Sequence, residues 1–129
     1  MGSEMCIRDR PSDVHVFADQ RLFLRAVENL LRNAVRHAHS KVLLEVTKEA
    51  KRVCLAVHDD GPGIPEALRA KVLEPFFRLQ ADRGRTTGGV GLGLAIVDRI
   101  TKRHRGHLAI STSPLGGAKV TTVWPNARF

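Results

Sequence analysis

The sequence contains no tyrosine, and aromatic residues make up only 5% of its 129 residues. Proteins that bind single-stranded nucleic acids stack bases on aromatic side chains, so this scarcity speaks against such a role. The sequence also lacks any apolar run near the roughly 20 residues that cross a bilayer. We therefore expect no nucleic-acid partner and no direct membrane contact. By itself, the net charge of +8 is compatible with a nucleic acid, an acidic membrane surface or a polyanionic ligand such as a nucleotide.

Cysteine is scarce as well, with only Cys6 and Cys54 in the chain. Their separation matches neither a local disulfide pattern nor a metal-ligand spacing. Cys54 falls within an alternating apolar run, which predicts a buried, reduced thiol and is consistent with a cytoplasmic location. The six histidines include no run with a third convergent ligand, so we expect no histidine metal site.

The first ten residues, MGSEMCIRDR, continue no pattern found later and contain no signal-peptide core. We interpret residues 1–10 as a scar of cloning or sequencing and leave them out of the fold. Residues 11–129 have the length of one domain with a single core.

Segments whose apolar residues recur with the period of a helix or a strand are separated by short stretches that contain Gly and Pro. VHVFAD (Val14–Asp19) alternates like a short strand, and Asp19 suits the N-cap of a helix that runs to about His39. Lys41–Lys48 and Arg52–Asp59 are β-rich runs separated by three residues, which predicts a hairpin.

The second half of the chain predicts a short helix at Glu66–Leu73 and an amphipathic helix at Leu92–Arg103, closed by Gly106 as its C′ residue. The runs HLAISTS and AKVTTVW then predict two strands joined across PLGG. This order favours an α+β two-layer sandwich, in which about three helices cover one face of a mixed, largely antiparallel sheet.

Four segments carry residues with distinctive chemistry. The first is a stripe on the predicted long helix, formed by Asn29, Asn33, Arg36 and His37. An amide oxygen is a hard ligand suited to Mg²⁺, and an arginine one turn away can bind phosphate oxygens. Asparagine is a poor helix former, which favours a functional role, although a solvated helix face has the same pattern.

The second segment is DDGPGIP, which follows an apolar strand. A carboxylate at Asp59 can accept a hydrogen bond from an exocyclic amine such as that of adenine. Gly61 and Gly63 let the chain turn sharply and leave room for a flat ligand. The alternative is an ordinary Asp-rich turn.

The third segment is EPFFR, in which Phe76 and Phe77 are either core residues or the hinge of the following loop. The fourth is GGVGLGL, which fits neither a P-loop nor a dinucleotide-binding fingerprint. Glycines before a helix leave the backbone N–H groups of its first turn open to an anion, which predicts a phosphate contact.

Taken in order, these segments resemble the ATP-binding catalytic domain of sensor histidine kinases, within the larger family of gyrase, Hsp90 and MutL ATPases. ENLLRNAVRHA resembles the N box, VHDDGPGIP the first glycine box, EPFF the F box, GGVGLGLAIV the second glycine box and PLGGAKVTTVWP a third. The resemblance covers about Val14–Pro125 and implies the Bergerat ATP-binding fold with Mg²⁺ and ATP as ligands.

The resemblance also implies roles for individual residues. Asn33 coordinates Mg²⁺, and Asn29 helps to hold the metal or the phosphates. Arg36 reaches the phosphates, His37 packs beside adenine, and Asp59 takes the adenine amino group. The other positions matched to nucleotide contacts are Gly61, Gly63, Ile64, Phe76, Phe77, Gly89, Val90, Gly91, Leu92, Gly93, Leu94 and Thr122. The resemblance implies that the glycines of GGVGLGL hinge a lid over the triphosphate, and the candidate cations of this lid are Arg78, Arg83 and Arg85.

One position separates the subfamilies. The ATPases carry a glutamate one turn before the metal asparagine to activate water, whereas histidine kinases carry an asparagine, as this chain does at Asn29. Glu28 is one residue away and therefore lies roughly 100° around the helix. The resemblance thus implies a protein histidine kinase, which transfers the γ-phosphate to a histidine rather than to water.

No phosphoacceptor histidine or dimerisation hairpin is recognisable in the sequence. We therefore expect a monomeric fragment, inactive alone, of a homodimeric and inner-membrane-anchored sensor. Its partners would be the histidine-containing dimerisation domain and a response regulator. The strand that the family places before Val14 would also be missing, which would leave an unpaired sheet edge. Two alternatives stay open, an anti-sigma-factor-type serine kinase and a degenerate, non-catalytic nucleotide-binding module.

Overall fold

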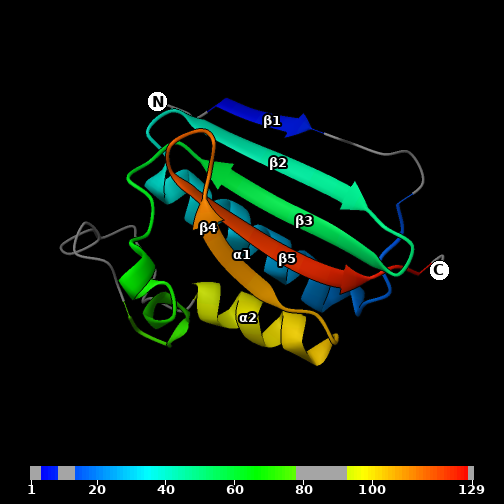
Figure 1. Ribbon diagram of the computed structural model, residues 1–129. Coiled ribbons are helices and arrows are strands. Elements are labelled where there is room, and N and C mark those ends of the chain that lie inside the picture. Colours follow the sequence, from blue (N-terminus) through cyan, green and yellow to red (C-terminus); the bar gives the residue numbers. More distant parts are fainter. Residues whose placement is uncertain (1–3, 9–13, 78–92, 128–129) are drawn as a thin grey trace.

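The described part of the chain forms a five-stranded sheet that is covered on one face by helices (Figure 1). The computed structural model describes residues 4–8, 14–77 and 93–127. The strand order is β1-β2-β3-β5-β4, and only β1 and β2 are parallel. The strands are β1 Glu4–Arg8, β2 Lys41–Lys48, β3 Arg52–Asp59, β4 Leu108–Thr112 and β5 Ala118–Pro125. The helices are α1 Gln20–His37 and α2 Gly93–Arg103, with 3-10 turns η1 Glu66–Leu68 and η2 Lys71–Leu73.

The β2–β3 hairpin has the bounds that the sequence predicts. The strands pair from Val42 opposite Asp59 to Lys48 opposite Val53, and the backbone N–H of Glu49 closes the turn on the carbonyl of Arg52 over 2.8 Å. Alternate side chains along each strand point to opposite faces, so the apolar residues of one face meet the helices. The predicted mixed sheet with one helical layer is confirmed.

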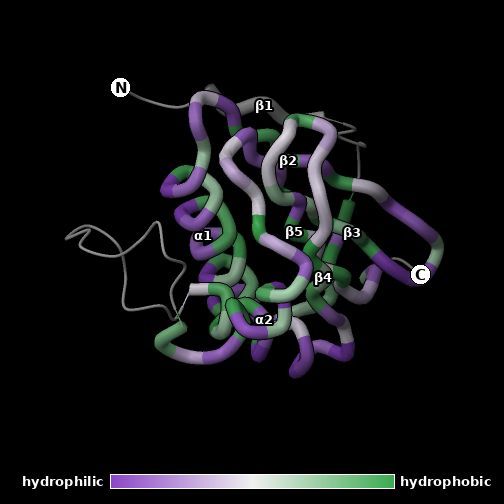
Figure 2. The backbone as a smooth tube through the Cα atoms, turned by 60° about the vertical axis from the view of Figure 1, so that its left-hand side comes forward, coloured by the Kyte–Doolittle hydropathy of each residue, from purple (hydrophilic) through white to green (hydrophobic). Residues whose placement is uncertain are grey.

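Helix α1 is an amphipathic helix with a side-chain cap. The Asp19 carboxylate accepts a hydrogen bond from the Leu22 N–H over 3.1 Å, as the predicted N-cap requires. The helix buries Ala26, Leu30 and Ala34 and ends at His37, two residues earlier than predicted. Apolar and polar residues alternate around its turns (Figure 2). A period of 3.6 residues predicts Val35 on the apolar face of this helix, but its side chain is 46% exposed.

The core lies between the sheet and the two helices. Trp124 of β5 is fully buried, and its ring meets the edge of Phe23 at a centroid distance of 4.8 Å. Its indole N–H donates to the Thr122 hydroxyl over 2.8 Å, so the buried polar atom is satisfied. Leu94 and Val97 of α2 complete the contact with α1.

His104 joins the end of α2 to the start of α1. Its Nε2 accepts a hydrogen bond from the backbone N–H of Asp19 over 3.1 Å, and its Nδ1 lies 2.7 Å from the carbonyl oxygen of Ile100. A carbonyl can only accept and a backbone N–H can only donate, so Nδ1 is the donor and Nε2 is the acceptor in these two hydrogen bonds. This bond ties the end of α2 to the start of α1.

Two predictions about the N-terminal part of the chain are wrong. Val14–Asp19 is not a strand, because the segment runs straight into the cap of α1 and only Val16 bridges to the sheet, at Asn126. Residues 1–10 do not all lie outside the fold, because Glu4–Arg8 pairs with β2 and occupies the edge that we expected to be unpaired. The unpaired N–H and C=O groups of an edge strand can pair with an extended segment of any sequence. The pattern of side chains therefore did not reveal this pairing.

The ends of two helical segments also differ from the predictions. Arg105, not Gly106, is the C′ residue of α2, since Arg105 has φ +62° and donates to the Lys102 carbonyl. Gly106 is the next residue and donates to the Thr101 carbonyl, which completes a Schellman motif. The predicted helix at Glu66–Leu73 is two separate 3-10 turns.

Candidate functional site

A buried carboxylate lies where β3 ends. Asp59 is 3% exposed and, by the alternation of β3, lies on the face that carries the helices. Its Oδ1 accepts hydrogen bonds from the N–H groups of Gly61, at 2.9 Å, and Ala118, at 3.3 Å. No described residue donates to Oδ2. A buried carboxylate oxygen without a donor is costly, so Asp59 is suited to accept a hydrogen bond from a ligand.

Two glycines bring backbone segments into contact around Asp59. A Cβ at Gly61 would overlap the carbonyl oxygen of His37, and a Cβ at Gly117 would overlap Asp59 Oδ1. Gly117 also donates to the Asp59 carbonyl over 3.1 Å. Close approach of this kind requires glycine, which explains the first glycine segment and PLGG. The end of α1, the end of β3 and the turn before β5 therefore meet at Asp59.

Asp60 holds the same junction from the other side. Its carboxylate accepts hydrogen bonds from the N–H groups of His39, Ser40 and Lys41 and from the Ser40 hydroxyl, at 2.8 to 3.0 Å. The N–H groups of Lys41 and Ser40 are the main reason that the pKa of Asp60 lies well below its usual range. The two adjacent aspartates thus have different surroundings, because Asp60 fastens the α1–β2 turn and Asp59 has one oxygen without a donor among the described residues.

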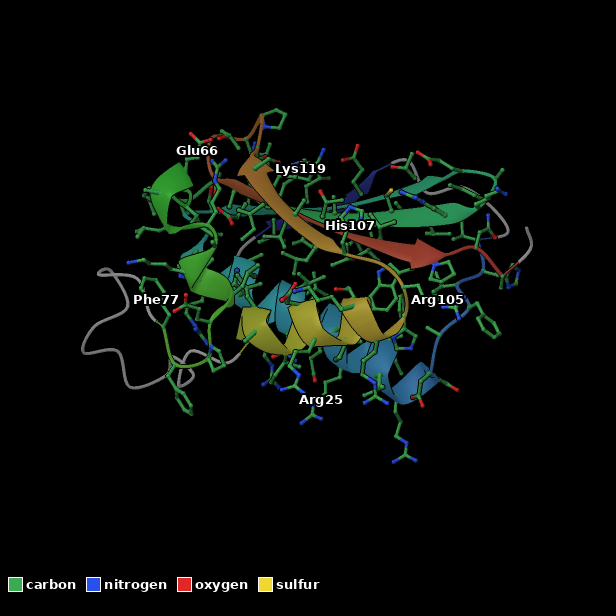
Figure 3. All side chains as sticks on the ribbon, turned by 60° about the horizontal axis from the view of Figure 1, so that its bottom comes forward. Arg25, Glu66, Phe77, Arg105, His107 and Lys119 are labelled. Carbon is green, nitrogen blue, oxygen red and sulfur yellow. The ribbon has the colours of Figure 1, made fainter. Side chains whose placement is uncertain are left out.

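Asn29 presents an oxygen toward the start of α2. Its amide nitrogen donates to the Arg25 carbonyl over 2.8 Å, which leaves Oδ1 as the available atom. That oxygen lies 3.6 Å from where a Cβ would stand on Gly93. The Arg25 side chain points away from the sheet (Figure 3), so only its carbonyl takes part.

The other predicted residues of the helix stripe lie one and two turns further along α1. The Asn33 amide and the Arg36 guanidinium make no hydrogen bond or ion pair with the described residues. His37 donates from Nδ1 to the Asn33 carbonyl over 2.9 Å. The stripe is half-buried. An amide oxygen and a guanidinium in such a position can bind a cation and phosphate oxygens.

The predicted apolar residues divide between core and surface. Ile64 and Leu94 are buried in the core, and Phe77 packs against it beside η2 (Figure 3). Phe76 is 69% exposed and has φ +69°, a conformation that is strained for a bulky side chain. Gly63 has φ +79° within the turn after Asp59.

Thr122 does not lie with the other predicted residues. It pairs with Leu55 in the middle of the sheet, four residues along β5 from Ala118. Its hydroxyl donates its one hydrogen to the Leu55 carbonyl over 3.1 Å and accepts from Trp124, and the residue is fully buried, so these partners account for the position of Thr122 without a ligand. Gly89, Val90, Gly91, Leu92, Arg78, Arg83 and Arg85 lie outside the described residues.

The sequence reasoning missed Arg69, which braces the segment after Asp59. Its Nε donates to the Ile64 carbonyl over 3.0 Å, and its Nη2 donates to the Thr112 hydroxyl over 3.2 Å. The arginine therefore joins the glycine segment to the end of β4. No pattern in the sequence links residues that are 43 positions apart.

Within the described ranges, no three His, Cys, Asp or Glu side chains gather as a metal-binding group. In the same ranges no helix is both long enough and apolar enough to cross a bilayer. Cys54 is free and half-buried, and burial raises the pKa of its thiol.

Residues 18–128 match the family of histidine kinase-, DNA gyrase B- and HSP90-like ATPases. The chain belongs to this family. It is 47% identical over 107 residues to the sensor protein RstB of Escherichia coli strain K12, an alignment that covers 83% of this chain and 25% of RstB. The chain spans about a quarter of the length of the curated relatives that it matches.

Two solved structures of histidine kinases have the same fold. The mycobacterial sensor histidine kinase MprB superposes with a TM-score of 0.78 at 29% identity, over 97% of this chain and 81% of that chain. Full-length ShkA in complex with AMPPNP superposes with a TM-score of 0.81 at 30% identity, over 98% of this chain and 26% of ShkA. The recognised family and its ATP-binding fold are thus confirmed.

Proposed function

We propose that this chain binds Mg·ATP and, as part of a longer sensor kinase, donates the γ-phosphate to a histidine on a separate domain. The observation that carries the proposal is the buried Asp59 carboxylate, which keeps Oδ2 without a donor among the described residues. The similarity to ShkA, whose structure contains AMPPNP, supports an adenine nucleotide as the ligand.

Asp59 would recognise the adenine base. The exocyclic amine of adenine donates a hydrogen bond, and Oδ2 can accept it. Guanine carries a carbonyl at the equivalent position, and a carbonyl facing a carboxylate oxygen leaves two acceptors without a hydrogen between them. The site therefore prefers ATP over GTP, and burial of Asp59 strengthens the preference because water cannot replace the lost bond.

The phosphates would lie along the stripe of α1. Asn33 supplies an amide oxygen for Mg²⁺, and Asn29 Oδ1, which faces the start of α2, lies one turn away. The Arg36 guanidinium, which has no partner among the described residues, binds phosphate oxygens. Mg²⁺, when bound, neutralises charge on the phosphates. The chain's own task is to hold the γ-phosphate in position for an acceptor.

The surroundings of Asn29 favour phosphotransfer over hydrolysis. Glu28, the nearest carboxylate on the helix, is exposed and pairs with Arg32 at 3.5 Å. No carboxylate of α1 is therefore placed beside Asn29 to activate water. The acceptor would be an imidazole nucleophile from the dimerisation domain of a membrane-anchored, homodimeric parent, which passes the phosphate to a response regulator. The relatives' names as sensor proteins support this role.

Isothermal titration with a non-hydrolysable ATP analogue, with and without Mg²⁺ and with GTP alongside, tests the binding. We expect Mg-dependent binding of the ATP analogue and at least about tenfold weaker binding of GTP. Asn33→Asp should lose most of the affinity, whereas Asn126→Asp, the same chemical change at the residue that follows β5, should keep it. Near-native affinity in Asn33→Asp would refute the metal assignment.

Transfer of labelled phosphate to separate acceptor domains tests the chemistry. We expect labelling of a histidine-containing dimerisation domain and none of a serine-containing acceptor. Labelling of serine would favour the anti-sigma-factor type of kinase. Absence of nucleotide binding by the folded chain would favour a degenerate module.

A further inference from the structure

A chain of three hydrogen-bonded side chains lies on the sheet face opposite the helices. His58 precedes Asp59 on β3 and is 3% exposed, although none of the described helices covers this face (Figure 1). Its Nε2 lies 2.9 Å from Glu45 Oε1 on β2, and its Nδ1 lies 2.8 Å from the Ser113 hydroxyl after β4. A buried histidine with both ring nitrogens engaged is held in one orientation.

The groups at the two ends of this chain, the Glu45 carboxylate and the Ser113 hydroxyl, determine which atoms donate and which accept. The Glu45 carboxylate accepts, so Nε2 carries a hydrogen. The Ser113 hydroxyl already accepts from the Leu115 N–H at 3.0 Å, and it has one hydrogen to give. When His58 is neutral, the Ser113 hydroxyl donates its hydrogen to Nδ1. The Ser113 hydroxyl and both ring nitrogens of His58 then each have a hydrogen-bond partner.

Ser113 is the first residue of the turn that reaches Asp59. The turn closes on itself through the Ser113 N–H to the Gly117 carbonyl, at 2.8 Å, and the Gly116 N–H to the Ser113 carbonyl, at 2.9 Å. Its last residue, Gly117, donates to the Asp59 carbonyl, and Ala118 donates to Asp59 Oδ1. His58 and Asp59 therefore hold the two ends of one turn from neighbouring positions on β3. Lys119, the strand partner of His58, lies beside this turn (Figure 3).

We propose that His58 is a positioning residue for adenine recognition. By holding Ser113, it places the Gly117 and Ala118 N–H groups on Asp59, which fixes Oδ1 and leaves Oδ2 for the exocyclic amine. The inference deepens the proposed function and rests on it. Only the bond from His58 to Ser113 is needed for this role, whereas the bond to Glu45 orients the ring.

Two substitutions separate the bonds of His58. The amide of asparagine has a polar atom where His58 has Nδ1, and the amide of glutamine has one where His58 has Nε2. His58→Asn can keep the bond to Ser113 and lose Glu45, whereas His58→Gln can keep Glu45 and lose Ser113. Ser113→Ala removes the same bond from the other side.

The experiment compares ATP with inosine triphosphate, which has a carbonyl in place of the exocyclic amine. Affinities for both nucleotides are measured by titration for the wild-type chain and each variant, and thermal unfolding monitors the fold. We expect His58→Gln and Ser113→Ala to lose about tenfold in ATP affinity with little change for inosine triphosphate. His58→Asn should restore the preference for ATP. Thr101→Val, which removes a buried hydroxyl from α2, is the matched control.

The outcomes distinguish this inference from the proposed function. An unchanged ATP preference in both His58→Gln and Ser113→Ala overturns the inference and leaves the proposed function standing. Equal losses for both nucleotides overturn it as well, since they indicate a structural role alone. Failure of the wild-type chain to bind ATP overturns the proposed function and the inference together. If His58→Gln does not fold, Ser113→Ala decides.

Discussion

The carbonyl oxygen of His37 lies directly against Gly61, in the space that a Cβ of residue 61 would occupy. This contact joins the end of α1, which carries Asn33, to the turn that follows Asp59. Asp60 fastens the same junction through the backbone of residues 39–41. The spacing between the candidate metal ligand and the candidate base-binding carboxylate is thus set by main-chain contacts.

Gly61→Ala should be destabilising and should weaken nucleotide binding. The added methyl overlaps main chain rather than a flexible side chain, so we expect a loss of about 2 kcal/mol in the free energy of unfolding, typical of overpacking. Urea unfolding measures this loss, and titration measures the accompanying fall in ATP affinity. Wild-type values for both quantities would show that the junction yields easily.

Gly93→Ala should weaken nucleotide binding without destabilising the fold. A methyl at Gly93 meets only Asn29 Oδ1 at 3.6 Å, and alanine favours a helix over glycine by up to about 1 kcal/mol. We expect an equal or higher melting temperature together with weaker Mg·ATP binding, because the methyl fills the space beside Asn29 Oδ1. In the stability measurement, Gly93→Ala is also the control for Gly61→Ala, because it makes the same substitution where the added methyl overlaps no main-chain atom. Undiminished affinity would argue against a role for Asn29 in binding.

Asp60 should make the fold sensitive to acid. Its pKa is lowered in the folded chain, chiefly by the Lys41 and Ser40 N–H groups, so the folded state holds the charged form more strongly than the unfolded state does. The resulting stability is present above the unfolded pKa of about 4 and is lost as the pH falls below it. The difference in melting temperature between wild type and Asp60→Asn should therefore shrink between pH 5 and pH 2.

Comparing wild type with the variant at each pH cancels those pH effects on the melting temperature that the two proteins share. Asp98→Asn is the matched control, because the Asp98 carboxylate pairs with Lys102 at 3.1 Å and accepts no hydrogen bond from a backbone N–H of the described residues. A wild-type advantage over Asp60→Asn that stays constant down to pH 2 would contradict the prediction.

Arg105→Gly should stabilise the chain. Arg105 has φ +62° at the C′ position of α2, a left-handed conformation that costs an L-residue about 1 kcal/mol and costs glycine little. We expect the melting temperature to rise by roughly 4 °C. Arg103→Gly, inside the last turn of the same helix, should lower it. A fall in melting temperature for Arg105→Gly would indicate that the arginine side chain has a stabilising contact.

The elements themselves follow from local sequence. The Asp19 cap with the apolar stripe of α1, the two β-rich runs around Glu49–Lys51 and the last strand pair are each encoded within a few residues, so periodicity and turn chemistry predict them. The candidate site was predictable in the same way, since Asn29, Asn33 and Asp59 stand in short motifs that resemble those of one family.

The tertiary structure decided what depends on partners far away in the chain. Pairing of Glu4–Arg8 with β2 uses main-chain groups that every sequence has, so no side-chain pattern announces it. The division of tasks between Asp59 and Asp60, the engagement of Thr122 with Trp124 and the chain from Glu45 to Ser113 likewise depend on donors brought together by folding. A sequence displays the groups that can form hydrogen bonds, and only the folded chain determines which of them meet.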